Sequence, residues 1–251
     1  MLLDAVEIKI TFDRPQVQAA LDALGAMPER RTRSVHFCED VTAAVVAGTP
    51  LFDANVILRI RSTEGSADDS TIKLRPCRQT QLTDRWLDAA RDHEPDLKAE
   101  ADWAGTRRVL AVSCTRDLPD GLLGAVLADD EPLGALFSDR QEQFLADCGG
   151  IRVNLAAATM LPRIAATRWG PFRTAPPDPK LKIVAERWVV GEELDFLELS
   201  VQAEPEKAER KQAALGEFVR SRGLEPDPGQ ETKTRRVLTY LTDRLAAEVP
   251  K

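Results

Sequence analysis

Alternation of charged and aliphatic side chains along short segments is the feature of this sequence that most constrains its fold. The side chains of a β-strand point to opposite faces with a period of two. Arg59 and Arg61 therefore share one face of a strand, whereas Leu58 and Ile60 share the other. The same sorting recurs in other segments, with the charged members Glu7 and Lys9, Lys73 and Arg75, Lys98, Glu100 and Asp102, Lys182 and Glu186, and Glu198. The pattern predicts a sheet with one charged face and one aliphatic face.

Two kinds of sheet fit this pattern. A half-exposed antiparallel sheet turns its polar face to water, and for any single strand this is the more common case. Here, however, basic pairs occupy two consecutive strands and acidic residues occupy others, and paired arginines suit phosphate oxygens. The predicted helices also need an apolar surface to cover. An α+β fold meets both conditions: a closed antiparallel β-barrel of about eight strands, with helices outside and a wet, charged interior that holds an ionic ligand.

Hydrophobic periodicity gives the expected elements. Strands are expected at 6–12, 33–38, 55–62, 70–75, 97–103, 107–114, 137–145, 151–156, 163–169, 181–190 and 194–201, and helices at 14–25, 79–91, 205–221 and 234–249. Positions 118–137 are expected to be irregular or helical, and the proline-rich positions 170–179 a loop. The chain 1–251 is interpreted as a single domain with an insertion around 118–179 and a C-terminal helical brace at 204–251.

Composition narrows the classes of function. The formal net charge is -7, which argues against a general nucleic-acid binder. No apolar run is long enough to span a membrane and the N-terminus does not resemble a signal peptide, so a cytoplasmic location is expected. The four cysteines have neither the spacing nor the histidine partners of a zinc site and are interpreted as buried thiols. No phosphate-binding loop or dinucleotide-binding glycine motif occurs, and nothing in the sequence indicates an oligomeric state.

Several short motifs, spread in order over nearly the whole chain, resemble those of one superfamily. They are Glu7-Ile8-Lys9, Arg59-Ile60-Arg61, Lys73-Leu74-Arg75, Glu100-Ala101-Asp102, Arg140, the pair Glu186 and Glu198, and Lys233. Together they resemble the motifs of the CYTH, or triphosphate tunnel metalloenzyme, superfamily, and the tail resembles that of large bacterial CYTH-domain proteins. The superfamily includes thiamine triphosphatases, inorganic tripolyphosphatases, class IV adenylate cyclases and fungal-type RNA triphosphatases. The chain departs from the pattern at Ala5 and Ser200, where the family has glutamates.

The resemblance implies metal-dependent hydrolysis of a small anionic substrate, either tripolyphosphate or a nucleoside or thiamine triphosphate. The implied phosphate-binding residues are Lys9, Arg59, Arg61, Lys73, Arg75, Arg140, Lys182 and Lys233. The implied ligands of Mg²⁺ or Mn²⁺, hard cations that prefer carboxylates, are Glu7, Asp102, Glu186 and Glu198. Lys9, Glu100 and Lys233 are the implied catalytic residues. No protein nucleophile is needed, because positioning and charge neutralisation carry most phosphoryl transfer.

The two departures leave a second hypothesis open. Loss of the carboxylates at Ala5 and Ser200 weakens metal binding, so the chain can instead be a degenerate tunnel that binds polyphosphate or a nucleotide without turnover. Adenylate cyclase activity is a third, less favoured alternative.

Overall fold

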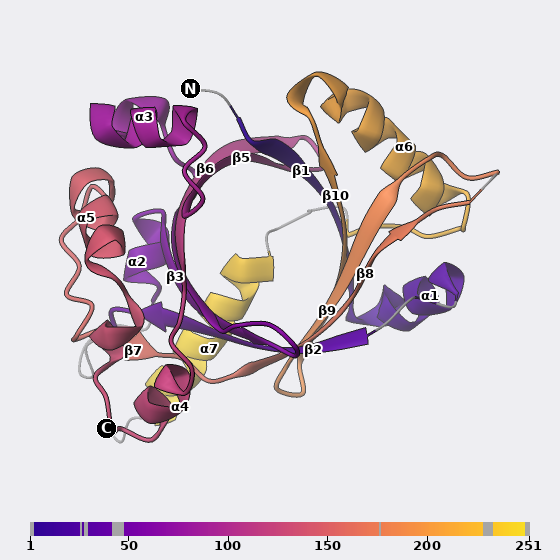
Figure 1. Ribbon diagram of the computed structural model, residues 1–251. Coiled ribbons are helices and arrows are strands. Elements are labelled where there is room, and N and C mark those ends of the chain that lie inside the picture. Colours follow the sequence, from indigo (N-terminus) through magenta and orange to yellow (C-terminus); the bar gives the residue numbers. More distant parts are fainter. Residues whose placement is uncertain are drawn as a thin grey trace.

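Nine strands close into a barrel (Figure 1). The structure, a computed structural model, describes residues 3–25, 27, 30–41, 48–175, 177–227 and 233–248. The strands are β1 (Ala5–Asp13), β2 (Arg30–Glu39), β3 (Val56–Thr63), β4 (Asp69–Leu74), β5 (Leu97–Ala104), β6 (Arg107–Asp117), β7 (Thr159–Met160), β8 (Ile164–Arg173), β9 (Lys182–Val190) and β10 (Leu194–Ala203). The order around the barrel is β3-β4-β6-β5-β1-β10-β9-β8-β2, closed by pairing of β2 with β3, and the short β7 extends β2 beyond the ring.

The barrel confirms the predicted closed, helix-covered fold and corrects two details. It has nine strands rather than about eight, and β1 runs parallel to β5, whereas its other neighbour, β10, is antiparallel. Hairpin turns impose antiparallel pairing on consecutive strands such as β5–β6 and β9–β10. No turn links β1 to β5, so their relative direction depends on how the barrel closes and not on a local signal.

Helices cover the outside of the barrel. They are α1 (Arg14–Leu24), α2 (Pro50–Asp53), α3 (Asp84–Arg91), α4 (Leu122–Leu127), α5 (Asp139–Cys148) and α6 (Ala208–Arg220), whereas the last helix is α7 (Lys233–Glu248). The aliphatic face of β1, β9 and β10 packs with residues of α1 and α6, and the aliphatic face of β3, β4 and β6 packs with residues of α3, α4 and α5. Ile8 and Ile60, which alternate with charged neighbours, are both almost fully buried in these outer cores. The predicted arrangement, with apolar side chains on the outer face of the barrel and charged side chains on the inner face, is therefore present.

Helix α7 enters the ring instead of bracing its outside (Figure 1). Its residues Val237, Leu238 and Leu241 form one buried cluster with inward-facing apolar side chains of the strands. Phe37 and Trp188 belong to this cluster, and by strand alternation they share a face with charged interior residues. One end of the barrel interior is thus filled by an apolar plug, and the charges gather in the rest.

Three expectations along the chain were wrong. Positions 137–145 form no strand, because Ser138 and Gln141 make a reciprocal capping box that begins α5. Positions 151–156 are likewise not a strand. The expected loop at 170–179 begins later, because β8 continues through a bulge between Trp169 and Phe172.

The last two expected helices are present as α6 and α7. Within the described ranges, no helix has the length and hydropathy needed to cross a membrane.

Candidate functional site

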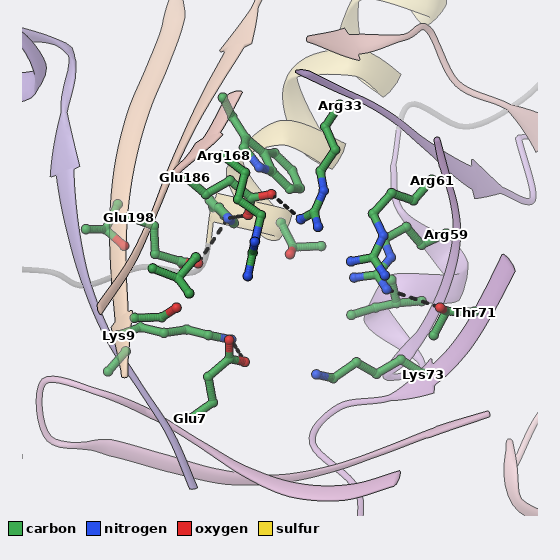
Figure 2. Close-up of a pocket in the computed structure, with 18 of the residues that line it drawn as sticks. Glu7, Lys9, Arg33, Arg59, Arg61, Thr71, Lys73, Arg168, Glu186 and Glu198 are labelled. Carbon is green, nitrogen blue, oxygen red and sulfur yellow. Dashed lines mark hydrogen bonds and ion pairs between the residues drawn. The ribbon is translucent and has the colours of Figure 1, made fainter. Parts of the chain in front are cut away.

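The charged interior of the barrel encloses a cavity of about 400 Å³. We call it the interior cavity. Nine cationic side chains and three carboxylates line it: Lys9, Arg33, Arg59, Arg61, Lys73, Arg75, Arg168, Lys182 and Lys233, with Glu7, Glu186 and Glu198. Figure 2 shows Arg59, Arg61 and Lys73 reaching from one wall toward Lys9 and Arg168 on the other. The cavity is thus strongly cationic, although the chain as a whole carries a net charge of -7.

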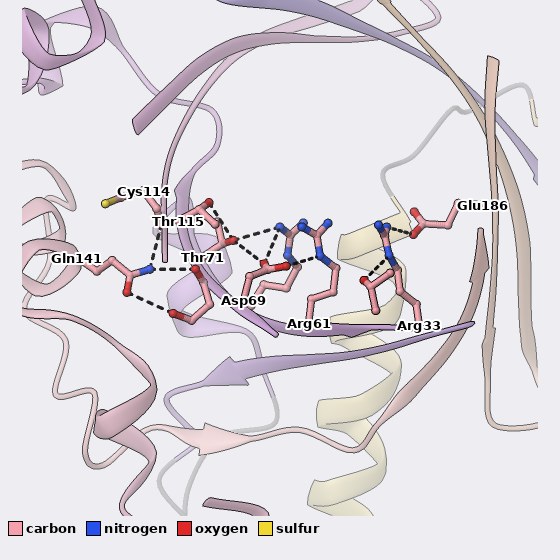
Figure 3. A network of polar contacts seen from close by, with 11 residues as sticks. Arg33, Arg61, Asp69, Thr71, Cys114, Thr115, Gln141 and Glu186 are labelled. Atoms are coloured by element: carbon pink, nitrogen blue, oxygen red, sulfur yellow. Dashed lines mark hydrogen bonds and ion pairs between the residues drawn. The ribbon is translucent and has the colours of Figure 1, made fainter. Parts of the chain in front are cut away.

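The first wall of the cavity is built by β3 and β4. Arg61 Nε lies 2.7 Å from Asp69 Oδ2, and Arg59 Nη2 donates to Thr71 Oγ1 at 3.1 Å. The strands behind them are fixed from outside, since the buried Gln141 of α5 donates to the backbone carbonyls of Ser70 and Cys114 (Figure 3). The strands that carry the arginine pair are therefore held from outside the barrel, and both arginines face the cavity.

The second wall centres on Asp102 of β5. Its carboxylate contacts Lys9 at 3.1 Å, Lys73 at 3.4 Å and Arg75 at 3.2 Å, while Lys9 also lies 2.7 Å from Glu7. Register places Glu7 opposite Asp102 on the parallel β1–β5 pair. One buried carboxylate thus anchors three cations, which leaves an excess of positive charge facing the cavity.

The third wall meets the plug helix. Lys233, the first residue of α7, lies 2.9 Å from Glu186 and 3.0 Å from Glu198, which are cross-strand neighbours on β9 and β10. Its ammonium also lies over the Trp188 ring, 4.3 Å from the centroid. Arg33 of β2 contacts the other oxygen of Glu186 at 2.6 Å. The two carboxylates therefore converge on one ammonium group at the inner end of the cavity.

Burial and neighbouring charges perturb the pKa values of the anionic groups. Burial acts to raise the pKa of Asp102, but Lys9, Lys73 and Arg75 outweigh it and hold the pKa well below its ordinary value. The same competition between burial and the charges of Lys233 and Arg33 lowers the pKa of Glu186. These carboxylates are ionised at neutral pH, so the ion pairs that fix the walls are intact there.

The pKa values of the cationic groups shift in opposite directions on the wall that carries Arg59 and at Lys233. Burial together with the adjacent Arg61 lowers the pKa of Arg59 to about 10. Burial likewise lowers the pKa of Lys73, only partly offset by Asp102. In Lys233, by contrast, the attraction of Glu186 and Glu198 outweighs burial and raises the pKa. Burial and the neighbouring Arg33 lower the pKa of Arg168 as well. Protein carboxylates therefore do not fully compensate the burial of Arg59, Lys73 and Arg168, and an anion beside them would add negative charge.

Buried donors without a partner point to the same conclusion. Among the described residues, the buried side-chain nitrogens that lack a hydrogen-bond partner are Arg59 Nε, Arg75 Nη2 and Trp188 Nε1. All three residues line the interior cavity. An unsatisfied buried donor costs about 1–3 kcal/mol, so three of them around one cavity indicate an acceptor-rich ligand.

The structure brings together most of the residues selected from the sequence. Lys9, Arg59, Arg61, Lys73, Arg75, Lys182, Lys233, Glu7, Glu186 and Glu198 line the interior cavity, and Asp102 lies directly behind three of them. Glu100 does not line the cavity and contacts Lys98 and Gln202 instead. Arg140 lies outside the barrel on α5, where it pairs with Glu94 and Asp96 and stacks 5.0 Å from the Trp86 ring centroid. Its predicted phosphate contact is wrong, because its segment is a helix and not a barrel strand.

Sequence reasoning missed three contributors. Arg168 lines the cavity from β8, and Asp69 and Thr71 hold the arginine pair. Arg33, which pairs with Glu186, was not selected from the sequence either. Arg168 is the only charged inward residue between 164 and 169, so no alternation marks it. Asp69 lies in a segment that the sequence predicts as a turn. Its spacing of two and four residues from Thr71 and Lys73 nevertheless places it on the same strand face as these residues.

The carboxylates present offer a limited fit to Mg²⁺ or Mn²⁺. Within the described ranges, no group of three or more His, Cys, Asp or Glu side chains is placed to hold a metal ion. The point on which Glu186 and Glu198 converge is the Lys233 ammonium, so a metal ion held by this pair would take the place of that ammonium. Mg²⁺ is commonly held by one or two carboxylates together with substrate phosphates and water, so the pair fits such an ion only with Lys233 displaced and a phosphate bound. Ser200 and Gln202 next along β10 offer only neutral oxygens.

Comparison with known proteins identifies a shared fold. No family model and no curated protein matches the sequence. A solved structure of HpAC1 from Hippeastrum, an adenylyl cyclase candidate with a dominant triphosphatase activity, superposes with a TM-score of 0.61 at 16% identity, covering 92% of this chain and 93% of that one. An adenylate cyclase candidate from Bacillus halodurans superposes with a TM-score of 0.58 at 13% identity, covering 93% of this chain and 97% of that one. The fold described above is therefore shared with both neighbours over nearly the whole length of this chain.

Proposed function

We propose that this chain belongs to the CYTH superfamily and binds a triphosphate-containing anion in the interior cavity. The observation that carries the proposal is the set of nine cations facing three carboxylates around about 400 Å³, with three unpartnered buried donors. A triphosphate supplies several negative charges and many acceptor oxygens within a short linear chain. Arginine and lysine side chains that face one another across the cavity match such a ligand.

The proposed reaction is hydrolysis of the terminal phosphoanhydride. Water adds to the terminal phosphorus, the bridging P–O bond breaks, and orthophosphate leaves together with the shortened chain. Arg59, Arg61 and Lys73 neutralise the phosphate oxygens, and Lys9 faces them from the opposite wall. Mg²⁺ or Mn²⁺ held by Glu186 and Glu198 would add charge neutralisation at the phosphate. The activity named for HpAC1, which shares this fold, is in keeping with that reaction.

A specific observation favours a second function, binding without turnover. Ala5 and Ser200 remove two carboxylates that the superfamily pattern places near the metal, and the described residues contain no group of three metal-binding side chains. The cationic walls do not depend on those positions. Anion binding is therefore common to both proposals, and they differ only in whether the bound anion is cleaved.

One experiment separates them. The purified protein is incubated with tripolyphosphate, ATP or thiamine triphosphate, with Mg²⁺, with Mn²⁺ or with a chelator, and the release of phosphate, pyrophosphate and cyclic AMP is measured beside the thermal stability. Phosphate release that requires the metal supports the hydrolase. Thermal stabilisation by tripolyphosphate without any product supports the binder. Neither stabilisation nor product would reject the triphosphate site itself.

A further inference from the structure

A groove on the outside of the barrel forms a surface of its own, apart from the interior cavity. Its volume is about 760 Å³, and it lies between β7 and the end of α4 with the turn that follows this helix. We call it the edge groove. No residue lines both the edge groove and the interior cavity, so the two surfaces are separate.

The free edge of β7 forms one side of the edge groove. β7 is the last strand in the sheet order, and among the described residues only β2 pairs with it (Figure 1). Leu161 donates its amide to the carbonyl of Phe37 at 2.8 Å, so alternation along the strand turns the N–H and C=O of Met160 away from β2. The edge of β7 therefore offers a donor and an acceptor to an added strand.

The side chains of two consecutive residues show that the groove follows this edge. Met160 packs against the outer apolar core beneath α3, α4 and α5, whereas Leu161 belongs to the apolar plug inside the ring. Both nevertheless line the groove. A surface that touches side chains on both faces of a strand runs along its edge and not over one face.

The polar groups of the lining are acceptors. Asp129, Asp130 and Glu131 are exposed on the other side of the groove, and within the described part of the chain none of them forms an ion pair or a side-chain hydrogen bond. His36, only 6% exposed, donates its Nδ1–H to the carbonyl of Leu161 at 3.2 Å, which leaves Nε2 as an acceptor without a partner among the described residues. Burial lowers the pKa of His36 and so keeps Nε2 unprotonated at neutral pH. No lysine or arginine lines the groove, so it fits a partner rich in cationic donors.

Apolar side chains complete the lining and narrow the choice of partner. Leu127 is 55% exposed, more than any other large hydrophobic side chain that the structure describes, and it lines the groove beside Leu133 and Met160. A metal ion would not use this apolar surface, and a polyamine has no backbone to pair with a strand edge. A polypeptide with basic and apolar side chains matches the edge, the carboxylates and the apolar surface together.

We infer that the edge groove is a docking site for an extended, basic segment of another protein. The segment adds a short strand to the free edge of β7. Its lysine or arginine side chains face Asp129, Asp130 and Glu131, and its apolar side chains pack against Leu127 and Met160. Because the groove lies outside the ring, this docking does not depend on which ligand the interior cavity holds.

The test selects a ligand and then asks which groups of the groove hold it. A library of random short peptides displayed on phage is selected on the parent protein. The most enriched peptide is synthesised, and its dissociation constant is measured by calorimetry on the parent and on a groove variant. The groove variant combines Asp129→Asn, Asp130→Asn and Glu131→Gln; asparagine is well tolerated at the positive φ of Asp129.

A control variant has the same change in net charge at positions that do not line the groove. It replaces three exposed carboxylates by their amides: Asp92→Asn, Glu193→Gln and Glu217→Gln. Two further peptides carry N-methyl groups on alternate residues, one in each of the two possible phases. N-methylation removes backbone donors along one edge of the peptide and leaves every side chain in place.

The enriched peptides are expected to contain lysine or arginine beside apolar residues. The best of them should lose about tenfold in affinity on the groove variant and none on the control variant. One N-methylation phase should abolish binding and the other should not, because only one edge of the peptide pairs with β7. The inference is overturned by a selection without enrichment, by equal affinity for the parent and the groove variant, or by equal tolerance of both N-methylation phases.

Two additional measurements would assign the groove to another occupant. Spermine that binds as tightly as the peptide, with the same loss on the groove variant, would make the groove a site for a small polycation. Dimerisation of the parent in analytical ultracentrifugation, abolished by Leu127→Ser, would make it an interface between two copies of this chain. Either outcome overturns the inference.

Discussion

Replacement of Arg59 by methionine separates the two things that this residue does. Its guanidinium is held in the first wall by Thr71 at 3.1 Å, with Asp69 at the longer distance of 3.8 Å, and its side chain is 28% exposed. Burial and the neighbouring Arg61 lower its pKa from 12.5 to about 10. At about 1.4 kcal/mol per pKa unit, holding this charge in the folded protein costs on the order of 3 kcal/mol.

Methionine keeps the apolar stem and removes the charge. Loss of the Thr71 hydrogen bond costs about 1 kcal/mol, and solvent at the partly exposed guanidinium reduces the gain from removing the charge. The free energy of unfolding of the ligand-free variant is therefore expected to rise by about 0.5–2 kcal/mol. A guanidinium–phosphate contact contributes about 1.5–3 kcal/mol, so affinity for tripolyphosphate is expected to fall by roughly 10–100-fold.

Both effects are measurable on one preparation. Urea unfolding gives the free energy of unfolding without ligand, and calorimetry with tripolyphosphate gives the dissociation constant. Arg152→Met, an exposed arginine outside the barrel, is the matched control and should change neither quantity appreciably. Wild-type affinity in the Arg59→Met variant, or a loss of more than about 1 kcal/mol of stability, would show that Arg59 is a structural residue and not a poised phosphate ligand.

Three further predictions concern buried titratable groups. Burial raises the pKa of Glu39 to about 7 from 4.5, so between these pH values the folded form holds a proton that the unfolded chain releases. The contribution of Glu39 to stability is therefore most favourable below pH 4.5 and falls as the pH rises to 7. The Tm difference between Glu39→Gln and the parent should therefore grow from about pH 5 to about pH 8, and a constant difference contradicts this. Lys233→Met leaves Glu186 and Glu198 without their shared ammonium and should cost about 3 kcal/mol at neutral pH by urea unfolding; an unchanged free energy of unfolding refutes it. All four cysteines are buried free thiols, and burial raises the pKa of Cys77 to about 11, so a thiol reagent should label the native protein only after unfolding.

Strand parity predicted the part of the site that depends on local pattern. Arg59, Arg61, Lys73 and Arg75 all line the cavity, because a side chain's face within a strand is fixed by its neighbours in sequence. The apolar outer face followed from the same alternation. Both features needed no knowledge of which strands pair.

The features that the sequence did not predict depend on distant contacts. The parallel β1–β5 pairing and the entry of α7 into the ring depend on closure of the whole barrel. Arg168 and Asp69 joined the site through contacts across strands rather than through a visible motif. The predicted position of Arg140 on a strand was wrong for a different reason. Ser138 and Gln141 carry a helix-capping signature, and the helix that begins there contains Arg140.

The central claim is that the interior cavity holds a triphosphate. A crystal structure of the protein grown with tripolyphosphate and Mn²⁺ tests it most directly. The account predicts a phosphate chain between Arg59 and Lys73 on one wall and Lys9 on the other, with hydrogen bonds to the unpartnered nitrogens Arg59 Nε and Arg75 Nη2. Phosphate bound only on the outer surface, with Lys9 and Lys73 still turned to Asp102 around a cavity free of phosphate, would contradict it.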